Sequence, residues 1–161
     1  MKFVCFCLFL LFNSCNIKSD RSNSGKKSAD KFYTDQGDWD DSRIPLIKPY
    51  ELIRLKGDSQ WIMSLFTTSI NVSITNVIEV NVLDSIIIVH SGETNFIGGV
   101  NPKEAWFIVL ANTKIEKGFT KRRDFEKELL AMHVGNAFFI KANSVYSSFT
   151  KNKIIKWKTL K

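Results

Sequence analysis

The sequence predicts an α+β domain in which an antiparallel sheet of five or more strands carries one main helix packed on one face. Three observations support this fold class. Apolar and polar residues alternate over 70–82, which is typical of a half-buried strand. The runs 86–89 and 105–110 are continuously apolar, as expected of central strands covered on both faces. A stripe of apolar residues at helical spacing then follows within 121–133, and this helix is the predicted cover.

The region before the alternating strand is predicted to be extended. Residues 43–50 contain two prolines, which exclude a helix interior or a central strand, so we expect an extended lead-in there. Two short strands are predicted at 50–56 and 60–66. The Lys-Gly-Asp-Ser sequence of 56–59 has the composition of a turn and would join them.

The main helix is expected near 121–133, where Phe125, Leu129 and Met132 form one stripe. Thr120 is its predicted N-cap, and Gly135 is placed to end it. The three cations that follow Thr120 oppose the helix dipole, which makes the exact start of the helix less well defined.

A second, shorter helix is predicted near the C-terminus. Asn143 is its expected cap, and Val145, Tyr146 and Phe149 are its apolar residues. We expect a last extended piece around 154–157.

The N-terminal segment has the pattern of an export signal. Lys2 precedes an apolar run over 3–12, which is too short for a bilayer that needs about 20 residues but fits the core of a signal peptide. The small residue Ser14 stands directly before Cys15. Residues 11–15 resemble the lipobox of bacterial lipoproteins, whose cysteine is diacylated after cleavage before it. The alternatives are an uncleaved membrane anchor and an ordinary signal peptide with a coincidental cysteine.

This interpretation divides the chain into three parts. Residues 1–14 are the predicted lipoprotein signal peptide, and 15–37 comprise the lipidated Cys15 and a flexible tether of Ser, Asn, Lys, Asp and Gly. Residues 38–161 form the single α+β domain. We therefore expect the protein in the cell envelope, attached through the lipid on Cys15 to the outer membrane and facing the periplasm.

The composition of the chain excludes several structural classes and kinds of site. A hydrophobic content of 44%, with 13 Phe and 4 Trp, excludes disorder for most of the chain. All three cysteines lie within the first fifteen residues, so the mature chain keeps only Cys15 and has no disulfide framework, thiol nucleophile or cysteine-based zinc site. The formal charge is +7, but an exported protein meets no nucleic acid. Anionic lipid headgroups and acidic polysaccharide are the polyanions available to it.

Several packing motifs occur in order along the chain, at 49–53, 77–80, 84–88 and 105–109, followed by the Gly118-Phe119 pair and Phe125. This order resembles that of a family of small, uncharacterised bacterial lipoproteins with one β-rich domain, in which such strand motifs precede a Gly-Phe or Gly-Pro turn and a helix. The resemblance implies a fold rather than an activity, and it carries no catalytic residue.

Catalytic, metal-binding and cofactor sites are not predicted. His90 and His133 fit no Ser-His-Asp order or metal-ligand spacing, so both are expected to be structural. The aspartates within 35–41 do not match an EF-hand loop and are interpreted as a solvated junction, with a calcium site as the alternative.

Two segments are candidates for binding a partner. One is the long hairpin connection 91–99, where Phe96 and Ile97 are large apolar residues among turn formers. The other is the C-terminal run, which has no acidic residue and is interpreted either as a basic and aromatic patch for a polyanion or as an edge strand that its lysines protect from aggregation. Its residues are Lys151, Lys153, Lys156, Trp157 and Lys158.

These observations favour a non-enzymatic envelope lipoprotein that binds a protein partner, for example as an accessory or immunity-type module. The alternatives are an enzyme that acts on an envelope polymer, for which paired carboxylates in a cleft would be the signature, and a structural lipoprotein that binds a polyanion.

The lipid anchor is directly testable. The Cys15→Ser variant has no thiol to acylate, so we expect it to leave the membrane fraction or remain uncleaved, and to lose labelling by a fatty-acid analogue. Labelling that persists in this variant, measured by gel fluorescence, would assign the lipid to another residue.

Overall fold

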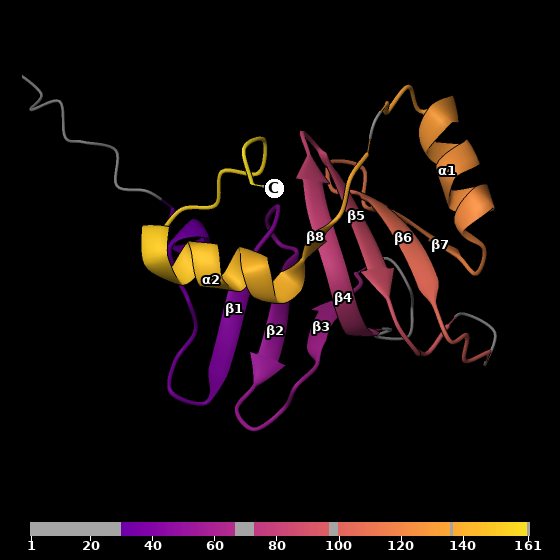
Figure 1. The fold of residues 1–161 in the computed structure, drawn as a ribbon. Coiled ribbons are helices and arrows are strands. Elements are labelled where there is room, and N and C mark those ends of the chain that lie inside the picture. The colour runs from indigo at the N-terminus through magenta and orange to yellow at the C-terminus, as the bar shows by residue number, and fades with distance from the viewer. Residues whose placement is uncertain (1–29, 67–72, 97–99, 136, 161) are drawn as a thin grey trace, which may run out of the picture.

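The computed structural model describes residues 30–66, 73–96, 100–135 and 137–160. Within them, seven strands form an antiparallel sheet in chain order, and an eighth pairs with β4 (Figure 1). The sheet contains β1 (Asp41–Pro45), β2 (Glu51–Leu55), β3 (Trp61–Ser64), β4 (Ser73–Leu83), β5 (Ile86–Ser91), β6 (Ala105–Leu110), β7 (Ile115–Phe119) and β8 (Ile140–Lys141). The helical elements are η1 (Lys31–Tyr33), α1 (Arg122–Ala131) and α2 (Ala142–Asn152). The predicted α+β fold is confirmed, with two helices of similar length in place of one main helix.

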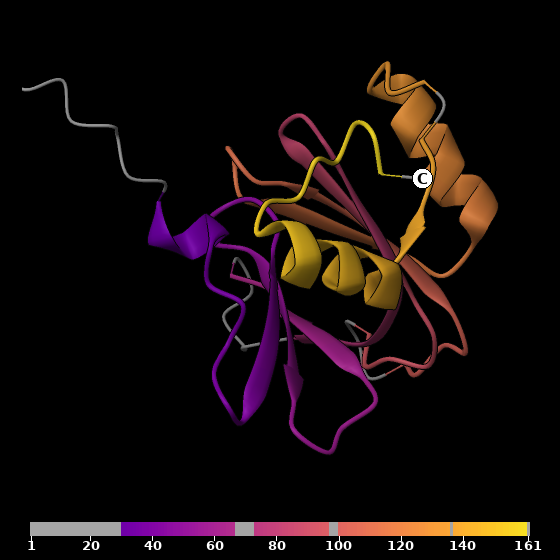
Figure 2. The same cartoon turned by 60° about the vertical axis from the view of Figure 1, so that its left-hand side comes forward.

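The long strand β4 divides one of its edges between two partners. Its first part pairs with β3, in which Trp61 lies opposite Val77, and its later part pairs with β8, in which Ile140 lies opposite Val80. β5 occupies the other edge, and the register shifts there between Val77 and Glu79. Because such a bulge bends a strand and increases its twist, β4 turns between its two partners. The strands consequently curve around α2 (Figure 2).

The two faces of the sheet hold separate cores. α2 covers one face, here called the α2 face, where Ala142 and Val145 are buried. α1 covers the opposite α1 face with Phe125 and Leu129. Alternate residues of the two continuous apolar runs serve the two cores, which confirms that both faces of β5 and β6 are covered. Ile87, Val89, Phe107 and Val109 belong to the α2 face, and Ile88, Trp106 and Ile108 to the α1 face.

A hydrogen-bonded carboxylate links the region before β2 to β7 across the α2 face. The hydroxyl of Tyr50 donates to Oε1 of Glu116 at 3.0 Å, and the backbone N–H of Phe66 donates to the same oxygen at 2.8 Å. Tyr50 is fully buried. Burial, followed by the hydrogen bond and the charge of Glu116, raises the pKa of Tyr50 well above its usual range.

The ends of α1 differ from the predicted ones. Lys121 rather than Thr120 is the N-cap, and it makes no side-chain capping bond. The helix ends at Ala131, and His133 takes the left-handed conformation (φ 57°) in place of Gly135. The N–H groups of His133 and Val134 donate to carbonyls of the last turn at 3.0 Å each, so they cap the helix before the glycine is reached.

α2 also begins earlier than predicted. Lys141 is its N-cap, and Asn143 lies inside the helix. The Asn143 side chain instead accepts hydrogen bonds from Nε1 of Trp61 at 2.8 Å and from Arg54 at 3.1 Å, so it fixes α2 to β2 and β3. The predicted buried residues Val145 and Phe149 are confirmed, and Tyr146 is half-buried.

Other segments differ from their predictions because pairing depends on distant partners. The predicted lead-in contains β1, which pairs along its whole length with β2. The Gly118-Phe119 pair lies in strand β7 rather than in a turn. The chain bends at 153–154 and turns at 157–159, with no strand between them, so the edge-strand interpretation of the C-terminal run is wrong. The chain is packed against the domain from Asp30 onward, before the predicted boundary at 38, since the Tyr33 hydroxyl accepts from the Lys48 N–H at 3.3 Å.

The raised pKa of Tyr50 predicts a dependence of stability on alkaline pH. Folding favours the neutral phenol, so its contribution is complete below the unfolded pKa of about 10 and is lost as the pH rises beyond it. We expect the free energy of unfolding, measured in urea, to fall above about pH 10 and to fall less steeply in Tyr50→Phe. Tyr146→Phe is the matched control, and equal slopes in the two variants would contradict the account.

The double-sided core predicts large costs for truncation on either face. Trp106 and Phe107 are both buried, on opposite faces of β6, so replacing either with Ala should lower the free energy of unfolding by about 3–5 kcal/mol. Leu130→Ala, on the exposed side of α1, should change it by less than about 0.5 kcal/mol. Unchanged thermal melting in both core variants would remove β6 from the centre of the fold.

Candidate functional site

The structure separates the two groups of residues predicted to bind a partner. Phe96 lies in the connection between β5 and β6, at one end of the sheet. The C-terminal run follows α2 and lies at the opposite end, beside the turn between β4 and β5 (Figure 1). Ile97 lies outside the described residues. The two predicted segments therefore form no common site.

Phe96, one of the two candidate contact residues in this connection, is half-buried. Its ring lies 5.8 Å from that of Phe107, and its N–H donates to the carbonyl of Val100 at 3.0 Å. A Cβ atom on Gly118 would come within 2.7 Å of the Phe96 ring. Glycine at this position of β7 therefore makes room for Phe96 at the edge of the core, which indicates a packing role.

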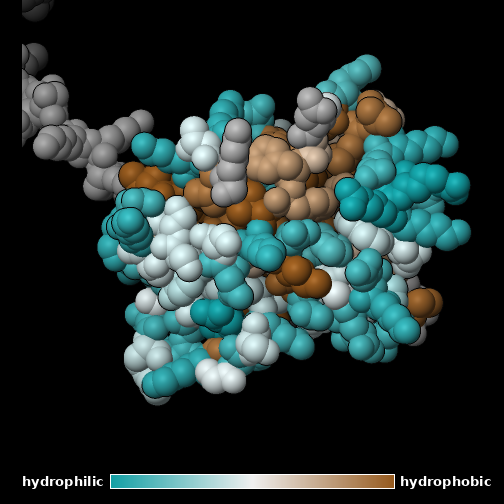
Figure 3. Space-filling model, viewed as in Figure 1, coloured by the Kyte–Doolittle hydropathy of each residue, from teal (hydrophilic) through white to brown (hydrophobic). Residues whose placement is uncertain are grey.

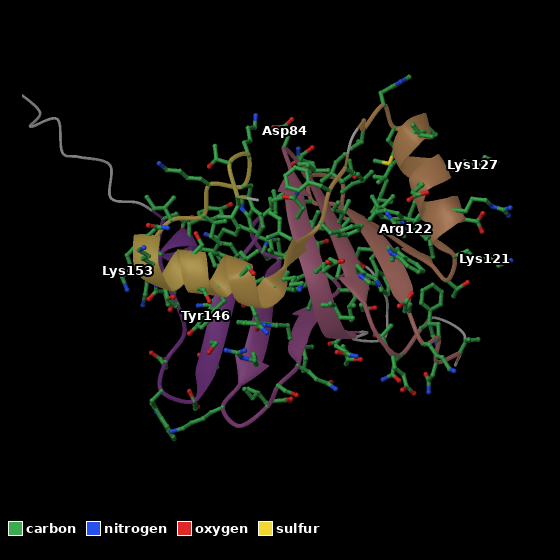
Figure 4. All side chains as sticks on the ribbon, viewed as in Figure 1. Asp84, Lys121, Arg122, Lys127, Tyr146 and Lys153 are labelled. Atoms are coloured by element: carbon green, nitrogen blue, oxygen red, sulfur yellow. The ribbon has the colours of Figure 1, made fainter. Side chains whose placement is uncertain are left out.

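The C-terminal lysine surface consists of Lys151, Lys153, Lys156 and Lys158 with Ile154 and Trp157. Its lysines are exposed, whereas Trp157 is half-buried against the core of the α2 face. Lys158 pairs with Asp84 at 3.2 Å, and both side chains are 85% exposed. Lys153 donates to Oε1 of Gln36 at 2.7 Å (labelled in Figure 4). No acidic residue follows Glu128 in the printed sequence, so the C-terminal segment itself is strongly basic.

Hollows lie on two sides of Trp157. One has a volume of about 540 Å³ and lies between the β4–β5 turn, the segment after α1 and Trp157. The second, of about 340 Å³, lies between η1, the end of β1 and the C-terminal segment. Figure 3 shows apolar residues gathered above α2, where this segment lies. Lining residues include His133, Phe138 and Lys158 in the first hollow, and Tyr33, Leu46 and Ile155 in the second.

The Trp39 tip, defined by Trp39, Leu55 and Lys56, was not predicted as a site. Trp39 is 80% exposed and Leu55 is 56% exposed. The Lys56 ammonium lies 5.3 Å from the centre of the Trp39 ring, and its backbone N–H donates to the carbonyl of Asp40 at 2.8 Å. The sequence did contain a signal for this site. Trp39 is a large aromatic residue within a segment of Gly and Asp, a composition typical of turns, which leaves no strand or helix at that position to bury its ring.

The acidic cluster near Trp39 has a structural use. Asp35 forms an ion pair with Arg43 at 2.5 Å, and Oδ1 of Asp41 accepts from the N–H of Asp38 at 2.8 Å. Asp38, Asp40 and Asp58 are exposed around the tip. The described residues contain no group of three or more His, Cys, Asp or Glu arranged to hold a metal ion. The tip is thus acidic, and Ile154 and Trp157 of the C-terminal lysine surface lie at the other end of the β1–β2 hairpin.

His90 is part of the packing on the α1 face. Its ring stacks on Trp106 with centres 5.2 Å apart and an angle of 5°, and Phe139 lies 6.0 Å away. Nδ1 lies 3.0 Å from Oε2 of Glu79, while Nε2 is buried and has no hydrogen-bond partner. The ring is enclosed by aromatic groups and lines neither hollow beside Trp157. This environment supports the structural role expected for it.

Comparison of the chain with protein-family models, curated proteins and solved structures finds no match. No helix within the described part of the chain is long and apolar enough to cross a membrane. A functional assignment therefore depends on the surfaces described above.

Proposed function

We propose that this chain is a lipid-anchored, non-enzymatic binding module of the cell envelope, of an accessory or immunity type, and that it binds a protein partner through the Trp39 tip. The observation that best supports this proposal is the exposure of Trp39. Its side chain is 80% exposed and lies beside the ammonium of Lys56. The lipid on Cys15 and the export signal, both expected from the sequence, supply the location.

The chemistry of the tip suits a protein partner. Tryptophan is enriched among the residues that dominate protein–protein binding energies, and Leu55 extends the apolar contact beside it. The exposed carboxylates of Asp38, Asp40 and Asp58 form a negative rim. Such a rim favours a partner with basic groups and repels polysaccharide or lipid of negative charge.

The alternative of an enzyme acting on an envelope polymer needs two carboxylates available to a substrate. Asp35 and Glu51 lie on either side of Arg43, and its guanidinium forms ion pairs with both. Glu51 thereby links β2 to β1, and Asp35 links the segment before β1 to the same strand, which is a structural use. The binding interpretation is therefore the better supported one.

Site-specific photo-crosslinking in cells that naturally make the protein tests the proposal. A crosslinking side chain in place of Trp39 or Leu55 should capture the same protein, since both positions belong to one tip. The exposed Leu130 of α1 is the matched control position and should capture nothing in common with them.

Once captured, the partner allows a quantitative measurement. Trp39→Ala should weaken its affinity by about 30-fold, the equivalent of about 2 kcal/mol for a central tryptophan, and Leu130→Ala should leave it unchanged. Capture of the same protein from position 130, or equal affinity of the Trp39→Ala variant, would contradict binding at the tip.

A further inference from the structure

We propose that the C-terminal lysine surface rests on the anionic bilayer that holds the lipid of Cys15, so that the domain is oriented with the Trp39 tip away from the membrane. This inference rests on the lipid anchor of the proposed function and adds a second contact with the same bilayer. The occupant of the surface is thus the headgroup layer of anionic phospholipid.

The first argument is uncompensated charge. Lys151, Lys153 and Lys156 form no ion pair within the described residues, and the ion pair of Lys158 with Asp84 is 85% exposed on both sides and therefore weak. Asp30, which lines the smaller hollow, pairs with Lys48 at 3.0 Å. Each lysine near an anionic membrane strengthens binding by roughly fivefold, the equivalent of about 1 kcal/mol.

The second argument is the apolar content of the same surface. Ile154 is 58% exposed, Trp157 is half-buried beside it, and Tyr33 of η1 is 41% exposed across the smaller hollow. Tryptophan and tyrosine prefer the membrane–water interface, where their rings meet the acyl boundary and their polar groups meet headgroups. Protein segments that bind at the membrane interface typically combine lysines with aromatic and apolar residues of this kind.

The third argument is the place where the chain enters the domain. Asp30 and Tyr33 line the same hollow as Ile154 and Trp157, so the link to Cys15 begins at the basic end. Asp30 is the fifteenth residue after Cys15, a distance of at most about 50 Å when fully extended. The lipid therefore holds the domain at high local concentration above the bilayer, where even a weak contact is populated.

Charge then selects the orientation. The carboxylates around the Trp39 tip are repelled by the same surface that attracts the lysines. Ile154 and Trp157 of the C-terminal lysine surface lie at the end of the β1–β2 hairpin opposite to the tip, so docking of this surface turns the tip outward. A partner would then meet Trp39 at the side of the domain that faces away from the bilayer.

The test uses the full lipidated protein in vesicles of phosphatidylcholine, with or without phosphatidylglycerol. A single cysteine is introduced at exposed Thr159 or at exposed Ser59 and labelled with a fluorophore, and quenching by nitroxide headgroup lipid is measured. We expect strong quenching at position 159 only with phosphatidylglycerol, its loss at high salt, and little quenching at position 59 in either vesicle.

Charge variants give the decisive comparison. Replacing Lys151, Lys153, Lys156 and Lys158 with Gln should lower the docked-to-undocked ratio by roughly fivefold per lysine, while the lipid keeps the protein on the vesicle. The control replaces Lys103, Lys121, Arg123 and Lys127 with Gln. Of these, Lys121 at the N-cap of α1 and Lys127 within it lie far from Lys153 (Figure 4). An equal loss in the control, or no quenching at position 159 with phosphatidylglycerol, would overturn the proposal.

Failure of the lipid anchor is recognised separately. If Cys15 carries no lipid, the chain without an introduced cysteine takes up the fluorophore and leaves the vesicles at high salt. Quenching at saturating vesicle concentration, measured in a background in which every native cysteine is replaced by Ser, then still shows whether position 159 or position 59 approaches the headgroups.

Discussion

The bend in β4 is the constraint on which the rest of the structure depends. The register shift between Val77 and Glu79 lets one strand hold β3 along its first part and β8 along its later part. Because β8 leads directly into α2, this pairing fixes the helix on its face of the sheet, where Val145 is fully buried. The chain leaving α2 is thereby carried to the end of the domain at which η1 enters. The C-terminal lysine surface is thus positioned by a backbone irregularity in a distant strand.

The same architecture gives the domain two ends of opposite character. Lysines and the partly buried Trp157 gather at the end where the chain enters, while the exposed Trp39 stands among carboxylates at the other. The charged groups of both ends are solvated and contribute little to folding stability. Stability comes instead from the apolar layers on the two faces of β5 and β6. Residues at both ends of the domain can therefore bind a membrane or a partner without being needed for folding.

Sequence patterns predicted the elements whose burial follows from local periodicity. The continuous runs of β5 and β6 indicated cover on both faces, and the stripe containing Phe125 and Leu129 identified α1. β7 was missed because a half-polar edge strand that includes Gly118 has no such pattern, and β8 because two residues show no period. The exposure of Trp39 and the conformation after α2 depend on contacts far along the chain. The sequence indicated a lipidation site at Cys15 and a basic C-terminal run as candidate functional features. No sequence pattern showed that Phe96 and Trp157 lie at opposite ends of the sheet.

The orientation of the domain on its bilayer is the central claim, and hydrogen–deuterium exchange of the lipidated protein tests it most directly without labels. Exchange is compared between anionic vesicles and a neutral detergent, since a docked surface loses access to solvent. The account predicts added protection in η1, in residues 153–160 and in the β4–β5 turn, with none around Trp39 or in the β2–β3 turn. Protection around Trp39, or equal exchange at the C-terminal lysine surface in the two conditions, would contradict it.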